Sequence, residues 1–124
     1  MAKKLPKIKF SGNKPENNIV KASLVSTGTY QVVGNKISFN ARHSAYINTQ
    51  IFVDVEKGYK LCFSVVPELA VKGMIAFNSP GNLTKGEIIV GLINCGREIV
   101  DIKNGDPIVN VWVEQIIDFD WESE

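Results

Sequence analysis

The residues that could do chemistry are few, and their types and spacing form no standard catalytic motif. His43 is the single histidine of the 124-residue chain and has no acidic neighbour within a few residues, so it is a poor general base or metal ligand. A hydrolase needs a carboxylate to activate water or to hold a metal ion. No Asp or Glu occurs from Asn17 to Val53 or from Leu69 to Gly86. The pattern therefore identifies no catalytic residue and no metal ligand.

Phosphate-binding patterns are equally sparse. Arg42 and Arg97 are the two arginines of the chain, and bidentate phosphate recognition normally uses more. No Gly-rich phosphate loop of either common type occurs, so we expect no cofactor. Lys85, at the base of a short Gly-containing loop, could meet a phosphate, but a solvated hairpin lysine is the simpler interpretation.

The overall charge excludes some partners. Lys and Arg number 14 against 13 Asp and Glu, a balance of +1, which gives no reason to expect nucleic acid or a membrane surface as the main partner. The first residues are basic and the last are acidic, so the two ends are either solvated and frayed or meet each other. Cys62 and Cys95 lie in apolar runs without metal-ligand spacing, and we expect both to be buried in a reducing, cytoplasmic compartment.

Short runs rich in Val, Ile, Phe and Tyr, broken by Gly or Asn, predict an all-β barrel or sandwich. "TYQVVGNKISFN" predicts a hairpin with a two-residue turn at Gly34-Asn35. "INTQIFVDVEKGYKLCFSVV" predicts two strands, the first with alternating faces, and "GEIIVGLIN" is apolar on both faces, which predicts a central strand or a subunit contact. One helical turn at most is expected, near residues 67–72.

We divide the chain into a basic N-terminal arm and loop (1–18), a β domain (19–116) and an acidic aromatic tail (117–124). The tail is expected either to lie over a groove of its own domain or to dock on a neighbour. The residues predicted for a subunit or partner interface are the apolar ones around this end, Trp112, Ile116, Phe119 and Trp121.

From about Asn48 to Ile116, the order of the sequence segments resembles the order of the motifs in the trimeric dUTPase family. This family shares its fold with dCTP deaminase. "SPGNLTKGEIIVGLINCG" is similar to the hairpin and strand of the family's third motif. "IVDIKNGDPIVNVWVEQI" is similar to the fourth motif, with Gly105-Asp106-x-Ile108 as its most specific part. The resemblance implies a distorted jelly-roll barrel of β-clip type that assembles as a homotrimer.

The sequence departs from the family at the positions that the resemblance would make catalytic. The third-motif hairpin is short and lacks Asp and Tyr, and Glu68 and Leu69 follow Pro67 where the family has a phosphate-binding Arg and Ser. Asn110 stands in place of a Gln, and no glycine-rich fifth motif occurs.

We therefore expect a catalytically degenerate, non-enzymatic member that acts as a structural protein, such as a phage virion component, or as a protein-binding effector. The alternative is a diverged nucleotide-binding protein or dUTP/dNTP nucleotidohydrolase with a reshaped pocket between subunits. The residues predicted for that pocket are Asn78, Ser79, Asn82, Lys85 and Asn110. We do not expect a nucleic-acid partner, since only the basic N-terminal residues favour one.

Overall fold

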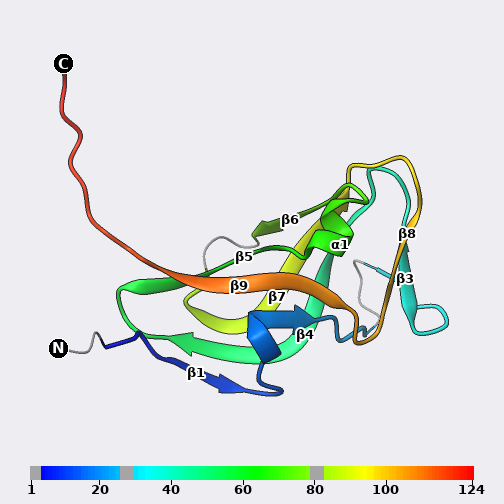
Figure 1. Cartoon of the computed structure of the whole chain (residues 1–124), viewed down its shortest axis with the longest axis horizontal. Coiled ribbons are helices and arrows are strands. Elements are labelled where there is room, and N and C mark those ends of the chain that lie inside the picture. Colours follow the sequence, from blue (N-terminus) through cyan, green and yellow to red (C-terminus); the bar gives the residue numbers. More distant parts are fainter. Residues whose placement is uncertain (1–3, 26–29, 79–82) are drawn as a thin grey trace.

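The computed structural model describes residues 4–25, 30–78 and 83–124. They fold almost entirely into strands, with two short helical turns (Figure 1). The elements in chain order are β1 (Ile8–Ser11), η1 (Glu16–Asn18), β2 (Ile19–Lys21), β3 (Lys36–Phe39), β4 (Ser44–Val55), β5 (Tyr59–Val65), α1 (Pro67–Ala70), β6 (Met74–Asn78), β7 (Lys85–Asn94), β8 (Val100–Lys103) and β9 (Pro107–Gln115).

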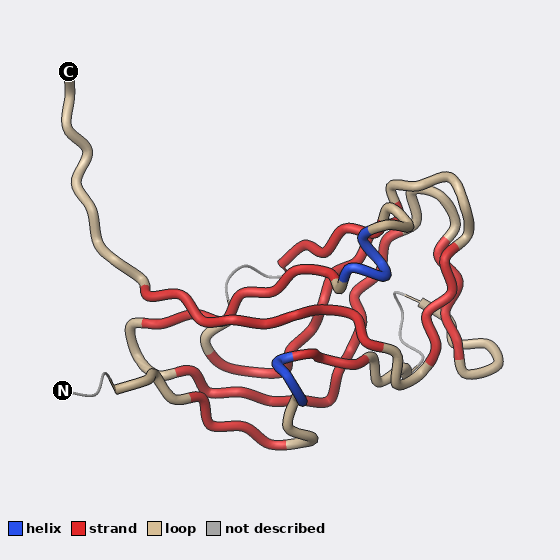
Figure 2. The backbone as a smooth tube through the Cα atoms, viewed as in Figure 1, coloured by secondary structure: helices blue, strands red, loops and turns tan. Residues whose placement is uncertain are grey.

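Antiparallel pairing joins the strands of the described chain into three sheets, in the orders β1-β4-β7-β6, β2-β9-β5 and β3-β8. The long strands β4, β7 and β9 run through the body of the molecule, and the small β3-β8 sheet stands at one end (Figures 1 and 2). The all-β prediction is confirmed. The predicted helical turn is also confirmed as α1, where Pro67 occupies the first helical turn and pre-sets its φ angle.

Burial of alternate apolar side chains holds the sheets together. Along β4, Ile51, Val53 and Val55 are buried while the residues between them are exposed, as the alternation predicted. β7 lies between β4 and β6, and Ile88 and Leu92 on its inner face are almost fully buried. This position confirms the prediction of a central strand. Removal of these side chains from water is the main driving force for the fold.

The turn at Gly34-Asn35 is present, with φ angles of 62° and 61° that match the type I′ turn expected for a two-residue hairpin. The hairpin itself is smaller than predicted. Val33 pairs with Lys36 in a single bridge, and β3 takes β8 as its strand partner. Tyr30 reaches the core without being part of a strand, with an exposed fraction of 6%.

Two expectations about local environment are wrong. Residues 8–11 are not a frayed N-terminal end, because they form β1 and pair with β4 along the edge of its sheet. Cys62 is buried as expected, but Cys95 is exposed. It follows the last residue of β7 in a turn that carries it to the surface, so an apolar run in the sequence did not guarantee burial.

The C-terminal tail leaves the domain after β9 and extends away from it (Figure 1). Phe119 and Trp121 contact each other edge to face, with ring centroids 5.5 Å apart, but are 73% and 91% exposed. The tail therefore does not lie over a groove of its own domain, which was one of the two predicted placements.

Among the described residues, no helix is long and apolar enough to cross a membrane.

Candidate functional site

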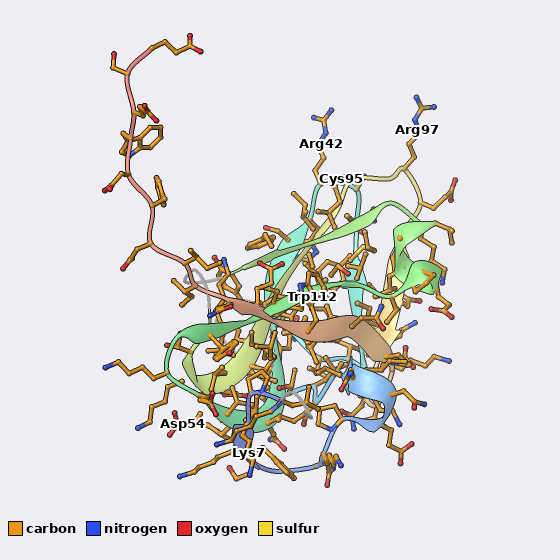
Figure 3. The ribbon with its side chains drawn as sticks, turned by 60° about the vertical axis from the view of Figure 1, so that its left-hand side comes forward. Lys7, Arg42, Asp54, Cys95, Arg97 and Trp112 are labelled. Atoms are coloured by element: carbon orange, nitrogen blue, oxygen red, sulfur yellow. The ribbon has the colours of Figure 1, made fainter. Side chains whose placement is uncertain are left out.

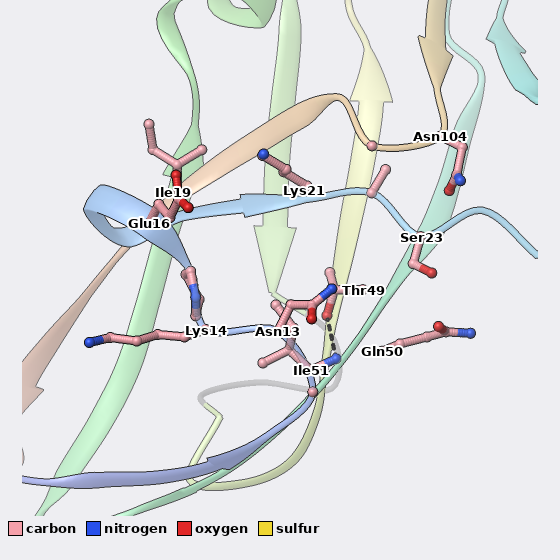
Figure 4. Close-up of a pocket in the computed structure, with 14 residues that line it drawn as sticks. Asn13, Lys14, Glu16, Ile19, Lys21, Ser23, Thr49, Gln50, Ile51 and Asn104 are labelled. Atoms are coloured by element: carbon pink, nitrogen blue, oxygen red, sulfur yellow. Dashed lines mark hydrogen bonds between the residues drawn. The ribbon is translucent and has the colours of Figure 1, made fainter.

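A cavity of about 610 Å³ opens between the loop that follows β1, the strand β2 and the middle of β4 (Figure 4). Residues 12–16 form one wall, residues 19–23 form the second, and residues 49–51 form the floor, with Asn104 and Gly105 closing the far end. Its size is within the range of small-molecule sites in proteins.

The first wall lies against the floor because residue 12 is a glycine. Gly12 has a φ angle of +97°, and a Cβ atom at this position would lie 2.5 Å from the backbone oxygen of Gln50. Any other residue would be strained and would push the loop away from β4. The glycine therefore sets how closely the loop approaches β4 and so shapes the cavity.

The floor is an irregularity in β4 that other residues hold in place. The register of β4 against β7 shifts between Asn48 and Phe52, and Gln50 has a left-handed φ angle of 57°. The Glu87 carboxylate accepts a hydrogen bond of 3.0 Å from the Gln50 backbone N–H and longer ones from the Asn48 side-chain amide. Bulges are designed features of a sheet rather than defects, and the Glu87 carboxylate holds this one in place.

Thr49 also holds the irregular segment of β4 in place, through hydrogen bonds on its buried side. Its buried hydroxyl donates a 2.7 Å hydrogen bond to the Ile88 carbonyl and accepts one of 3.3 Å from the Ile51 backbone N–H (Figure 4). A buried hydroxyl with both kinds of partner adds rigidity, since losing either bond would leave a desolvated polar group unpaired.

The far end of the cavity is oriented by Asn104. Its side-chain oxygen accepts a 2.9 Å hydrogen bond from the Leu24 backbone N–H. This hydrogen bond orients the amide, so that its NH₂ group can donate hydrogen bonds to other partners. The Ser23 backbone N–H donates to the Asn48 carbonyl at 3.0 Å, so this wall is tied to the floor.

The charges around the cavity are two lysines and one glutamate: Lys14, Lys21 and Glu16. Within the described residues the ion pairs are Lys36 with Asp101 and Lys60 with Glu114, so neither cavity lysine is paired. The same residues contain no group of three or more His, Cys, Asp or Glu able to hold a metal ion. The lining of the cavity therefore has an excess of positive charge.

Arg42 and Arg97 lie elsewhere. Figure 3 shows both projecting from one end of the molecule, beside Cys95, and neither lines the cavity. His43 is half-buried against the Phe39 ring, with centroids 5.5 Å apart. The chain thus offers no arginine or histidine to this site.

The residues predicted for a nucleotide pocket are not gathered on one sheet. Asn110 pairs with Ile19 of β2 on one side and Ser64 of β5 on the other. Lys85 starts β7, opposite Asp54 of β4. Ser79 and Asn82 lie outside the described residues, and Asn78 ends β6 with its side chain also undescribed.

Sequence reasoning missed most of the cavity. The segment "SGNKPENN" predicts a loop by its composition, and that loop supplies Asn13, Lys14 and Glu16. A lysine inside a Gly- and Asn-rich loop that precedes a strand was the available signal. Ile19 connects the cavity to the residues predicted for a nucleotide pocket, because it lines the cavity and pairs with Asn110.

Two of the residues predicted for an interface, Trp112 and Ile116, are exposed by 42% and 51%. The Trp112 indole N–H donates a 3.0 Å hydrogen bond to Glu114, and Trp112 pairs with Cys62 across β5 and β9. Burial, followed by the nearby Glu114 charge, raises the pKa of the Cys62 thiol. Phe119 and Trp121 are exposed on the tail, as described above.

Known proteins confirm the fold. A native dUTPase of EIAV matches 95% of this chain and 96% of its own with a TM-score of 0.67 and 16% sequence identity. A mutant dUTPase from phage phi11 of S. aureus matches the same shares with a TM-score of 0.70 and 11% identity. The protein therefore has the dUTPase fold.

Curated relatives identify the family. The deoxyuridine 5'-triphosphate nucleotidohydrolase of Wolbachia sp. subsp. Brugia malayi (strain TRS) is 30% identical over 107 residues, which cover 82% of this chain and 69% of the relative. The protein of the same name from Ehrlichia canis (strain Jake) is 38% identical over 81 residues, or 62% of this chain. The matched part is about half, 53%, of the length of that relative. No family model matches the chain. The chain belongs to the dUTPase family.

This membership corrects the prediction of a non-enzymatic structural or effector protein. The curated relatives are named as nucleotidohydrolases, so the enzymatic alternative fits better, and catalytic degeneracy is not shown. The prediction failed because it equated missing motif residues with missing chemistry. A pocket can also draw on groups outside the motifs, and such groups are not visible to a motif comparison.

Proposed function

We propose that the protein is a nucleotidohydrolase that acts on deoxyuridine triphosphate. The observation that carries the proposal is the 30% identity to a curated dUTP nucleotidohydrolase. The match covers 69% of the length of that relative. The dUTPase fold of the described residues supports it.

The predicted pocket residues come from two different sheets of the fold. Lys85 belongs to the β1-β4-β7-β6 sheet, and Asn110 belongs to the β2-β9-β5 sheet. We infer that the pocket lies between two copies and uses the amine of Lys85 from β7 of one copy and the amide of Asn110 from β9 of another. The amine would neutralise phosphate charge, and the amide would orient the nucleotide by hydrogen bonding.

The outer surface of the domain supports such a homo-oligomer. Tyr46 and Ile75, on β4 and β6, are exposed by 38% and 52%. Tyr46 packs edge to face on Phe77, with ring centroids 5.4 Å apart, and so extends an apolar face that one chain does not cover. Contiguous exposed apolar surface commonly marks a protein interface.

The tail and β1 are complementary in the way that strand addition requires. The tail alternates Ile117, Phe119 and Trp121 with acidic residues, which is the pattern of a strand with one apolar and one acidic face. β1 lies at the edge of its sheet and carries Lys9 beside the half-exposed Phe10. We infer that the tail of one copy adds to β1 of another, as in β-augmentation, in a trimeric assembly.

Hydrolysis of dUTP by the full chain tests the proposal. Purified protein should convert dUTP faster than dCTP, dTTP or dATP in the presence of Mg²⁺, with nucleotide products resolved by ion-exchange chromatography. EDTA and heat-treated protein are the controls for contaminating phosphatase. A turnover of dUTP no faster than that of the other nucleotides, or no faster than the heat-treated sample, would refute the proposed activity.

The assembly is tested separately by light scattering. The full chain should give the mass of a trimer, and a chain ending at Gln115 should give a smaller species. An unchanged mass on truncation would exclude the tail as the joining segment.

A further inference from the structure

The single Asn-Gly pair of the sequence, Asn104-Gly105, lies in the turn between β8 and β9. The Asp106 backbone N–H donates a 3.0 Å hydrogen bond to the Lys103 carbonyl, and Gly105 has a φ angle of +86°. A positive φ at the third residue of a turn favours glycine. Asn104 and Gly105 are both exposed, and a Cβ atom at Gly105 would meet nothing within 4 Å. Water therefore has access to this pair.

An Asn-Gly pair can hydrolyse its own side-chain amide. The glycine backbone nitrogen loses its proton and forms a bond to the asparagine Cγ, while the side-chain Cγ–N bond breaks and the amide leaves as ammonia. Water then opens the succinimide ring at either of its carbonyls. The product is aspartate, or isoaspartate, in which the main chain runs through the former side chain. Glycine favours ring closure because it has no Cβ atom in the way and adopts many backbone conformations.

Both reacting groups of this pair are held by one segment, residues 22–24, which follows β2. The Gly105 backbone N–H donates a 2.9 Å hydrogen bond to the Ala22 carbonyl. The Asn104 side-chain oxygen accepts one of 2.9 Å from the Leu24 backbone N–H. The nucleophile and the carbonyl that it attacks are thus each fixed by a separate bond. Neither group can turn toward the other while residues 22–24 stay in place.

We propose that Asn104-Gly105 is a deamidation site that residues 22–24 protect, and that it reacts when this segment opens. The only co-reactant is water, and no nucleotide takes part. The proposal is therefore independent of the proposed activity.

β2 is suited to local opening. It has three residues, lies at the edge of the β2-β9-β5 sheet, and changes its register against β9 between Val20 and Lys21. Short elements with few contacts open at a lower free energy than the core of a domain. The anchor that opposes opening is Val20, whose side chain has an exposed fraction of 0%.

The modification acts on the cavity and cannot be undone by closing. Isoaspartate lengthens the main chain by a methylene group and shortens the side chain, so the turn can no longer match both Ala22 and Leu24. Ala22, Ser23 and the Asn104-Gly105 pair line the far end of the cavity, where Figure 4 shows Ser23 and Asn104. A molecule that has reacted therefore keeps this end of the cavity open.

The test is incubation of the full-length protein at mildly alkaline pH in heavy-oxygen water, followed by mass spectrometry of its peptides. Residue 104 should incorporate heavy oxygen in protein unfolded by urea, and at least about tenfold more slowly in folded protein, because reaction requires opening. Labelling by an isoaspartyl methyltransferase measures the isoaspartate fraction. Asn104→Gln should abolish incorporation at this position, since the longer side chain disfavours ring closure.

Val20→Ala and Val90→Ala form a matched pair, because both valines have an exposed fraction of 0% and lose the same atoms. Val90 lies on β7, in a different sheet from β2. Val20→Ala should raise the deamidation rate at Asn104 by about fivefold or more, since it weakens the anchor of β2. Val90→Ala should change the rate by less than about twofold under conditions where circular dichroism shows both variants folded.

Hydrogen exchange of the modified protein, followed by NMR, tests the consequence. The amides of Ala22 and Leu24, which are bonded to the Asp106 carbonyl and the Asn104 side chain, should exchange faster in the isoaspartate form. The Cys95 amide, bonded to the Gly73 carbonyl, should exchange as before. Unchanged protection of Ala22 and Leu24 would reject the release of this segment.

Three outcomes would overturn the proposal itself. Unfolded protein that does not react at Asn104 would show that the pair is not a deamidation site. Folded protein that reacts as fast as unfolded protein would show that residues 22–24 give no protection. Equal acceleration by Val20→Ala and Val90→Ala would place the reaction in globally unfolded molecules.

Discussion

Asn94 offers the sharpest test of how the sheets are joined. It ends β7 with an exposed fraction of 0%. Its side-chain NH₂ donates hydrogen bonds of 2.9 Å to the Phe39 carbonyl and 2.8 Å to the Glu98 carbonyl. Its side-chain oxygen accepts one of 2.9 Å from the Gly96 backbone N–H. One side chain thus connects the end of β3, the end of β7 and the turn that leads to β8.

Variant Asn94→Ala removes all three bonds and leaves their backbone partners without replacements. Each intramolecular hydrogen bond contributes on average about 1 kcal/mol net, so the free energy of unfolding should fall by about 3 kcal/mol. Such a change is a large fraction of the stability of a small domain.

Urea denaturation followed by far-UV circular dichroism measures this free energy. The midpoint should fall and the m-value should stay constant. Asn40→Ala is the matched control, because the Asn40 side chain is exposed; it should change stability by less than about 0.5 kcal/mol. A loss below about 1 kcal/mol for Asn94→Ala, or a loss equal to the control, would refute the reasoning.

Three further predictions follow from single contacts. Thr49→Val removes a buried hydroxyl with two hydrogen-bond partners and should lower the free energy of unfolding in urea by about 2 kcal/mol, whereas Thr49→Ser should cost less. The hydrogen bond from Ser38 holds the pKa of Asp101 below its ordinary value of 3.8, so the ionised form stabilises the fold at neutral pH. The stability advantage of wild type over Asp101→Asn should shrink as the pH falls below 3.8, and an advantage that grew in acid would contradict this assignment. Iodoacetamide at pH about 8 should modify the exposed Cys95 faster than Cys62, whose pKa is raised by burial; urea should abolish the difference, which mass spectrometry of the peptides can quantify.

The sequence predicted strands and their buried faces well where the information is local. The alternation along β4 places Ile51, Val53 and Val55 inward, and Gly34-Asn35 forces a particular turn. Both depend on residues next to each other in the chain. The presence of Pro67 likewise located the turn of α-helix α1.

Strand partners and the cavity could not be predicted in the same way. β3 pairs with β8 rather than with the segment across its own turn, a choice that depends on residues far along the chain. The cavity unites Gly12, Lys21, Gln50 and Asn104 from four separate segments. No spacing in the sequence encodes such a convergence, and motif comparison drew attention to other residues.

The pairing of β2 with β9 has a consequence for how the chain is made. β2 (Ile19–Lys21) lies early in the chain, but the strand that pairs with it contains residues 107–110. During synthesis the emerging polypeptide therefore cannot complete this sheet until residues 107–110 have left the ribosome. Because such distant pairings dominate, we expect spontaneous refolding on the order of milliseconds to seconds, slower than for helical proteins of similar size. Until β9 arrives, the unpaired edges of β2 and β5 are exposed, and nascent chains should depend on chaperones during that interval.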